Sequence, residues 1–209
     1  MANERVTENT GSYVNDGFDP GSWKEIETYT EELLNRKISC SKCIEGIIRD
    51  ASELSEHISE KGALLYIGMT CDTESEEKKS SFLDFVENVR PKLSEFSDSL
   101  NRRIVGHVAI KDMPERYDLM IRSMKNDIEI FRKENIPLSV EQTKLVTEAQ
   151  AINGAMSVEY NGEEYTIPEM RAFLESNDRA VREGAWKAVA DRRIEDEERL
   201  SEIFDELIT

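Results

Sequence analysis

Two neighbouring stretches decide the fold: residues 156–167, MSVEYNGEEYTI, and residues 178–209, DRAVREGAWKAVADRRIEDEERLSEIFDELIT. In the first stretch, apolar and polar residues alternate on both sides of Asn161-Gly162. This dipeptide favours a two-residue hairpin turn, because both central residues of a type I′ turn need positive φ. A lone two-stranded hairpin is marginal in water, so this one is expected to pack on other elements. The second stretch lacks a helix-stop signal, so it predicts one long charged helix from Asp178 to Thr209.

The apolar side of this last helix is predicted from residues that recur at helical spacing. They are Val181, Ala185, Ala188, Val189, Leu200, Ile203, Phe204 and Leu207. Between hairpin and helix, Thr166 and Glu169 form a capping box that opens a short helix over residues 168–176. These signals predict that the hairpin packs on the helices or meets another surface.

Capping pairs and apolar stripes predict further helices upstream. The expected ranges are 22–37, 41–66, 73–106, 114–135 and 139–153. Glycine costs about 1 kcal/mol relative to alanine inside a helix, so a break is considered at Gly62. Pro91 lacks a backbone donor and predicts a kink near Asn88. The fold class is therefore mainly α, a multi-helix antiparallel bundle with one small β-hairpin at about residues 156–167.

The domain organisation follows from composition along the chain. Residues 1–21 are polar and rich in glycine and asparagine, which predicts a flexible N-terminal arm. The length of 209 residues fits one large domain or two small ones, either of which could bury a core, and residues 22–209 are assigned as one helical domain.

The composition limits the classes of function. The net charge is −17, from 44 acidic and 27 basic residues. Affinity for nucleic acid depends on Lys and Arg replacing phosphate counterions, so nucleic-acid binding is disfavoured. No apolar run is long enough to cross a membrane, and the N-terminus lacks the pattern of a secretory signal. We therefore expect a cytoplasmic protein with no nucleic-acid or membrane partner.

The three cysteines are Cys40, Cys43 and Cys71, an odd number that argues against a disulfide-stapled secreted module. Cys40 and Cys43 form a CxxC. A structural zinc site would need two more ligands, and a thioredoxin-like site would need a βαβ setting, whereas this segment resembles a helix start. Cys43 is in phase with Ile44 and Ile47, which favours a place in the core. A redox pair is the remaining interpretation, and thiol titration would test it.

Most catalytic signatures are absent from the sequence. It contains no HExxH, GxxxxGK[ST], GxGxxG or GxSxG. His57 is expected on an exposed helix face and His107 near a helix end, where it could cap terminal carbonyls. Residues 195–198 form a solvated acidic run balanced by nearby arginines, and Trp23 and Trp186 are expected to pack in the core. The sequence therefore assigns no catalytic, cofactor-binding or metal-binding residue.

Residues 134–193 resemble the N-terminal half of oligoendopeptidase F-type enzymes, which belong to the thimet oligopeptidase-like zinc metallopeptidases. The similar features are the apolar helix leading into a hairpin, the turn in EYNGEEYT (residues 159–166), and the helix opened by DRAVREGA (residues 178–185). The segment ASELSEHISEKGALLYIGMTCDTESEE (residues 51–77) is also similar to the leading helices of that family. The resemblance covers most of Ser22 to Thr209.

The resemblance implies a largely helical enzyme in which two halves enclose a channel, and short peptides are cleaved there at a zinc ion held by an HExxH helix and a later glutamate. All those ligands belong to the C-terminal half, so none is carried over to this chain. The implied role is the channel wall or lid, inactive alone, with the C-terminal catalytic half and short peptides as partners. A missing half would leave apolar surface exposed and favour self-association. The alternative is a stand-alone helical module that binds peptides or proteins without catalysis.

Overall fold

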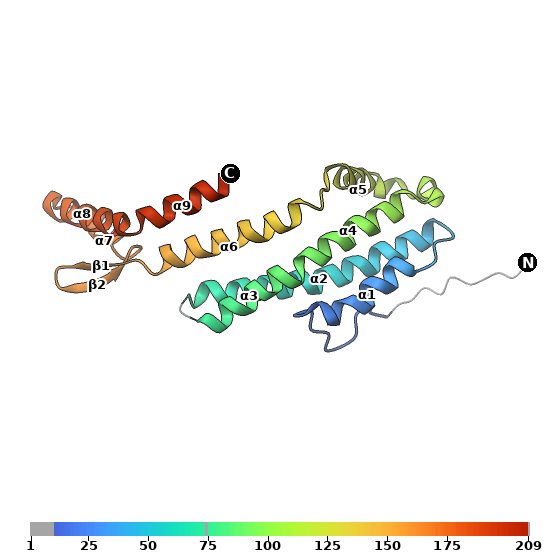
Figure 1. Cartoon of the computed structure of the whole chain (residues 1–209), viewed down its shortest axis with the longest axis horizontal. Coiled ribbons are helices and arrows are strands. Elements are labelled where there is room, and N and C mark those ends of the chain that lie inside the picture. Colours follow the sequence, from blue (N-terminus) through green and yellow to red (C-terminus); the bar gives the residue numbers. More distant parts are fainter. Residues whose placement is uncertain (1–10, 74, 209) are drawn as a thin grey trace, which may run out of the picture. The chain divides into compact units, whose positions relative to one another are not determined.

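A computed structural model describes residues 11–73 and 75–208 and divides the chain into two compact units, unit 1 up to Pro137 and unit 2 from Leu138 onward. Both units consist of helices, apart from one two-stranded hairpin in unit 2 (Figure 1). The mainly α fold class is thus confirmed. The expectation of a single domain over residues 22–209 stays a prediction, and the two units are described separately.

Unit 1 is a bundle of helices joined by short connections. Its elements are α1 (Trp23–Asn35), α2 (Ser41–Cys71), α3 (Glu76–Asn88), α4 (Arg90–Val105), the 3-10 turns η1 (Val108–Asp112) and η2 (Glu115–Tyr117), and α5 (Asp118–Ile130). Helix α2 packs on α3, and α4 contacts α1, α3 and α5. The expected single helix over residues 73–106, kinked near Asn88, is instead two helices: α3 ends at Asn88, and Pro91 lies in the first turn of α4.

The core of unit 1 is formed by side chains that are almost completely buried, including Ile26, Leu33, Ile44, Ile47, Phe85 and Ile104. Helix α2 passes through Gly62 without a break, contrary to the sequence-based suggestion. A Cβ at Gly62 would lie 3.0 Å from Cε1 of Phe85. The glycine therefore permits the close approach of α2 to the Phe85 ring of α3, and the packing outweighs its low helix propensity.

The predicted flexible arm falls partly outside the described residues, because residues 1–10 are not among them. Residues 11–21 lie against unit 1: Val14 is buried, and its backbone N–H donates to Glu53 of α2 at 3.0 Å. Phe18 packs edge-on against Tyr29 of α1. The flexibility of the arm stays a prediction, but its second half contributes to the core of the bundle.

Unit 2 contains the hairpin, which contacts one of the helices that follow it. Helix α6 (Asn135–Gly154) leads to β1 (Ser157–Tyr160) and β2 (Glu163–Thr166), followed by α7 (Arg171–Leu174), α8 (Arg179–Glu195) and α9 (Glu197–Ile208). The strands pair antiparallel, Tyr160 opposite Glu163, and Asn161 and Gly162 both have positive φ. The predicted hairpin is confirmed, and it packs on α8 through Val158, Met170 and Ala185.

Several helix boundaries differ from the sequence-based ranges, and α2, for example, extends to Cys71 rather than ending near residue 66. Helix α5 ends at Ile130, and Asn135 begins α6 rather than ending α5. The expected single helix from Asp178 is wrong, because α8 ends at Glu195 and α9 begins at Glu197. Acidic side chains are unfavourable at a helix C-terminus and favourable in a first turn. The run Glu195-Asp196-Glu197-Glu198 therefore favours a break at Asp196.

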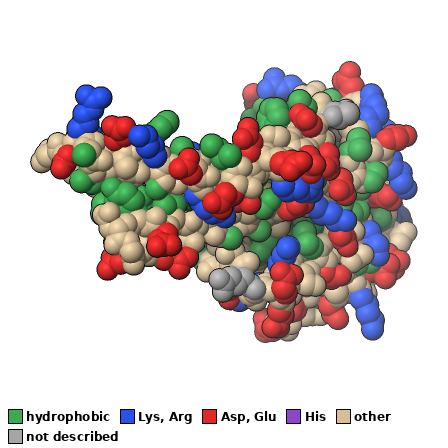
Figure 2. Space-filling model, turned by 60° about the vertical axis from the view of Figure 1, so that its left-hand side comes forward, with side chains coloured by type: hydrophobic (Ala, Val, Ile, Leu, Met, Phe, Trp, Pro, Cys, Tyr) green, Lys and Arg blue, Asp and Glu red, His purple; other side chains and the backbone are tan. Residues whose placement is uncertain are grey.

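The surface carries charges of both signs. On the face shown in Figure 2, acidic and basic side chains are intermixed with hydrophobic ones. None of the helices in residues 11–73 and 75–208 combines the length and the apolar character that crossing a bilayer requires.

Candidate functional site

The histidines and the acidic run considered in the sequence analysis form no metal site in the described part of the chain. Within it, no group of three or more His, Cys, Asp or Glu side chains could hold a metal ion. His57 packs edge-on against Phe18 at 6.1 Å between ring centroids. His107 does not cap the end of α4 but the start of η1, where its Nδ1 accepts a hydrogen bond from the Ala109 N–H at 3.2 Å.

The acidic run and the two tryptophans have ordinary structural roles. Arg192 pairs with Asp196 at 2.5 Å, so the predicted balance by arginine is confirmed there. Trp23 is half-buried and donates to Glu27 at 3.1 Å. Trp186 is 63% exposed, so its expected place in the core is wrong.

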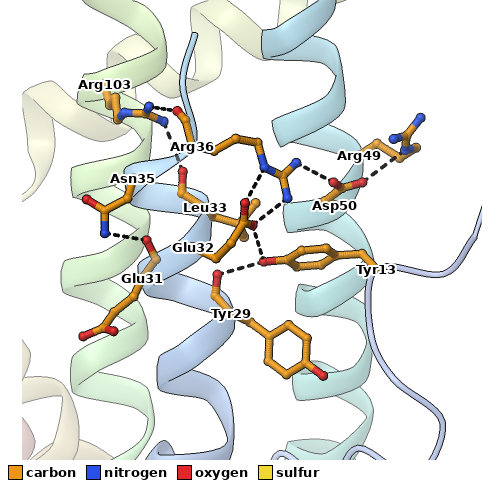
Figure 3. Close-up of polar contacts among 10 residues, drawn as sticks. All are labelled: Tyr13, Tyr29, Glu31, Glu32, Leu33, Asn35, Arg36, Arg49, Asp50 and Arg103. Carbon is orange, nitrogen blue, oxygen red and sulfur yellow. Dashed lines mark hydrogen bonds and ion pairs between the residues drawn. The ribbon is translucent and has the colours of Figure 1, made fainter. Parts of the chain in front are cut away.

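The most extensive polar network joins the N-terminal segment to α1 (Figure 3). The Tyr13 hydroxyl lies 2.9 Å from both the Tyr29 carbonyl oxygen and Oε2 of Glu32. One turn further along α1, the Arg36 guanidinium donates to both Glu32 oxygens at 2.8 and 2.6 Å. This bidentate geometry fixes the planes of both groups. The network therefore anchors the N-terminal segment on α1.

The same arginine carries the network to α2 and α4. Nη1 of Arg36 lies 2.5 Å from Oδ2 of Asp50, which is buried and also contacts Arg49 at 3.2 Å. From α4, Arg103 donates to the carbonyl oxygens of Leu33, at 3.1 Å, and of Arg36. These are carbonyls that the end of α1 leaves unpaired, and a cation there also complements the helix dipole. We regard the network as a structural clamp on four segments of unit 1.

Protonation equilibria in this network follow from its contacts. Hydrogen bonds from Arg36 lower the pKa of Glu32 below its ordinary value; burial, the next largest effect, opposes them, and the hydrogen bond from Tyr13 lowers the pKa further. Burial, followed by the neighbouring Glu32 carboxylate, raises the pKa of Tyr13. The arrangement thus favours an ionised Glu32 and a neutral Tyr13, which are the states that make the hydrogen bonds of Figure 3.

The sulfur atoms of Cys40 and Cys43 are in contact at the start of α2, 3.2 Å apart. Cys43 is only partly buried, so its expected place in the core is wrong. Cys71, in the last turn of the same helix, is exposed and separate from the pair. The CxxC motif was visible in the sequence. The partial exposure of the two sulfurs was not, because it depends on the conformation of the loop before α2, and hydrophobic periodicity does not predict loop conformation.

An apolar face on α9 is the second feature that the sequence did not predict. Ile203 is buried, but Phe204 and Ile208 are 62% and 68% exposed, so the expected burial of Phe204 is wrong. Next to Phe204 lies an open pocket of about 530 Å³ that Ile194 and Leu200 also line, with Arg193, Glu197 and Asp205 at its rim. We call Ile194, Leu200, Phe204 and Ile208 the α9 face. An apolar pocket with a charged rim is typical of a surface that docks another protein segment.

Comparisons with known proteins agree with the helical fold. The sequence model of the Peptidase M3 N-terminal domain matches residues 19–131, slightly more than half of the chain. The chain belongs to this family. The match is to the family's N-terminal domain, in agreement with the resemblance to the N-terminal region of oligoendopeptidase F-type enzymes. A search of curated proteins gave no match.

Solved structures extend the agreement to nearly the whole chain. A protein assigned as oligoendopeptidase F is similar with a TM-score of 0.83 and 20% identity, over 94% of this chain and 35% of that one. An oligoendopeptidase F of Bacillus anthracis str. Ames gives 0.83 and 18%, over 93% and 36%. PZ peptidase A, solved with an inhibitor, gives 0.83 and 20%, over 93% and 35%. This chain therefore spans about a third of the length of the structures it resembles.

Proposed function

We propose that the chain is the non-catalytic N-terminal part of a cytoplasmic zinc-dependent metalloendopeptidase that hydrolyses short peptides. In this proposal it forms the wall or lid of the substrate channel and is inactive without the HExxH-bearing half. The observation that supports it best is the fold: structures of whole peptidases contain an equivalent of nearly the entire chain within about a third of their length. The family membership of residues 19–131 points the same way.

The zinc of the enzyme would not be held by the residues described here. They offer no cluster of three or more candidate ligands, so the donor set does not fit a zinc site. The resemblance assigns the metal ligands and the catalytic glutamate to the C-terminal half. The contribution of this chain would therefore be to shape the channel and limit access to short, unfolded peptides.

The α9 face is the surface through which this chain would contact the catalytic half. Phe204 and Ile208 are one helical turn apart, and together with the adjacent pocket they present a continuous apolar strip. Burying such side chains gains about 25 cal/mol per Å² of apolar area removed from water. In the isolated chain the same strip favours self-association.

Reconstitution from two polypeptides tests this function. The chain alone is expected to bind no stoichiometric zinc and to leave a quenched fluorescent peptide intact. Mixed with the separately produced HExxH-bearing half from the same gene, it should give cleavage that a chelator abolishes. A gene without such a half, or a mixture no more active than the catalytic half alone, would overturn the proposal.

Two charge insertions test the docking surface. Phe204→Asp should weaken association of the halves at least tenfold, because it places a charge in an apolar contact. Leu119→Asp is the matched control, since Leu119 is 68% exposed on α5, outside the α9 face. Equal effects of the two variants would contradict a specific role for α9. Association of the halves without any gain in cleavage would favour the alternative, a helical interaction module.

A further inference from the structure

The start of α2 brings two thiols within reach of one covalent bond. Cys40 occupies the N-cap position and Cys43 lies three residues later in the first turn, so the two side chains emerge on the same side of the helix. Their sulfurs are 3.2 Å apart, and a disulfide would require them to approach to about 2.05 Å. Both side chains are partly exposed, so a small reagent can reach them. Side-chain rotation can supply the remaining movement.

The surroundings of Cys43 stabilise a negative charge on its sulfur. Oγ of Ser39 lies 3.3 Å from that sulfur, and the Cys40 sulfur is also in contact with it. The first turn of a 31-residue helix adds unpaired N–H groups and the positive end of the helix dipole. Hydrogen bonds from Ser39, and then from Cys40, lower the pKa of the Cys43 thiol to about 7 despite its partial burial.

We propose that Cys40 and Cys43 form a thiol–disulfide exchange site that reacts with low-molecular-weight disulfides, Cys43 attacking and Cys40 resolving. The Cys43 thiolate attacks one sulfur of the disulfide RSSR, forms a mixed disulfide and releases RS⁻. Cys40 then loses its proton to solvent or to RS⁻, attacks the Cys43 sulfur, forms the Cys40–Cys43 bond and releases the second RS⁻. In total the protein gives up two electrons and two protons, and RSSR becomes two RSH.

The assignment of roles follows from the contacts. The Cys43 sulfur accepts a hydrogen bond from Ser39, which stabilises its thiolate as the attacking group. The Cys40 side chain makes no capping hydrogen bond, so it can turn toward Cys43 as the resolving group. At pH 7, a pKa near 7 gives about fifteen times more thiolate than an ordinary cysteine, and the weaker nucleophilicity of that thiolate leaves about a threefold faster attack. The main advantage is the second step, because the resolving thiol is already in contact. Cys71 has no neighbouring thiol and can only form an adduct.

The test uses the whole chain, reduced and then treated at pH 7 with oxidised glutathione as the probe disulfide. Differential alkylation and peptide mass spectrometry then locate each modification. The wild type and Cys71→Ser should form the Cys40–Cys43 disulfide and retain no glutathione on either residue. Cys40→Ser should retain a stable mixed disulfide at Cys43, formed about threefold faster than the one at Cys71. Cys43→Ser should react at Cys40 no faster than at Cys71.

The variants keep the proposal falsifiable, because serine is a favourable N-cap residue and Cys40→Ser should fold at least as well as the wild type. Circular dichroism of each variant checks this. Two glutathione adducts in place of an internal disulfide would overturn the proposal, and so would free thiols at both positions while Cys71 is modified. Faster attack by Cys40 than by Cys43 would overturn the assignment of roles. None of these results depends on the peptidase function, since no catalytic half is present.

Discussion

The two units bury and expose hydrophobic side chains in different proportions. Unit 1 has one large core to which its helices and the segment before α1 contribute. Unit 2 has a smaller cluster between hairpin, α7 and α8. Yet among the described residues unit 2 exposes as many large hydrophobic side chains as unit 1, although it is about half as long. Those of unit 2 are Leu138, Val146, Trp186, Ile194, Phe204 and Ile208.

This difference in buried apolar side chains indicates which interactions stabilise each unit. In unit 1 the polar clamp of Tyr13, Glu32, Arg36 and Asp50 adds specificity to a core that is already complete. In unit 2 the amphipathic helix α9 buries Ile203 but leaves its second apolar strip in water. Unit 1 therefore has the larger core, whereas unit 2 presents an apolar surface suited to another protein segment.

The largest contrast is expected from removing one phenylalanine in each unit. Phe85→Ala in unit 1 should lower the free energy of unfolding by about 3–5 kcal/mol, because Phe85 is 3% exposed and its loss leaves a cavity beside Gly62. Phe204→Ala should change it by less than about 0.5 kcal/mol. Urea unfolding of both variants measures this, with Trp23 fluorescence reporting unit 1 in a Trp186→Phe background and Trp186 fluorescence reporting unit 2 in a Trp23→Phe background. Similar losses in the two variants would refute the contrast.

Breaking an ion pair should also lower the free energy of unfolding more in unit 1 than in unit 2. Arg36→Met leaves the buried Asp50 without its closest cation and is expected to cost about 2–3 kcal/mol, since Arg36 itself keeps some solvent contact. Lys187→Met removes an exposed pair with Glu183 on α8 and should cost less than about 0.5 kcal/mol. The double variant Arg36→Met/Asp50→Leu should recover most of the loss, as measured by the same unfolding curves. No recovery would mean that packing, not charge, explains the cost.

Local backbone geometry gives a smaller effect of opposite sign in the two units. Gly162→Ala in the hairpin turn should destabilise unit 2 by about 1–2 kcal/mol, because Gly162 has φ +84°. Gly46→Ala in α2 meets no atom within 4 Å and should stabilise unit 1 by about 0.5–1 kcal/mol. Hydrogen exchange of amides in β1 and β2 and in α2 measures the two effects separately. A stabilising Gly162→Ala would contradict the turn geometry.

Sequence reasoning succeeded where the signal was local. The Asn161-Gly162 turn needed only neighbouring residues and is confirmed, and Pro91 indicated the position near Asn88 where the helix in fact ends. The capping box is also confirmed, since the Thr166 N–H donates to Glu169 at 2.7 Å. Sequence reasoning failed where contacts between helices determine whether a helix continues or a side chain is buried. The continuity of α2 at Gly62 is explained by Phe85 on another helix. Phe204 is in phase with Leu200 one turn earlier, yet it is exposed.

The candidate sites were harder to predict for the same reason. The pattern showed Cys40 and Cys43 but could not show whether their sulfurs meet in the core or at the surface. Nothing in the sequence indicated that Arg36 would reach Asp50 across two helices, or that Arg103 would cap α1 from α4. Such contacts depend on three-dimensional neighbours rather than on spacing along the chain.

The smallest expected effect is the pH dependence that the clamp gives to unit 1. Because the folded-state pKa of Glu32 is lowered, its contribution to stability is present above the unfolded-state pKa of about 4.3 and is lost as the pH falls through the folded-state value. Glu32→Gln should therefore be less stable than the wild type at pH 7, with the difference shrinking below about pH 4. Glu31→Gln is the control, because the Glu31 carboxylate points away from the network in Figure 3. Urea midpoints from pH 7 to pH 3, read from Trp23, measure the difference, and a gap that stays constant over this range would show that Glu32 stabilises the clamp without its charge.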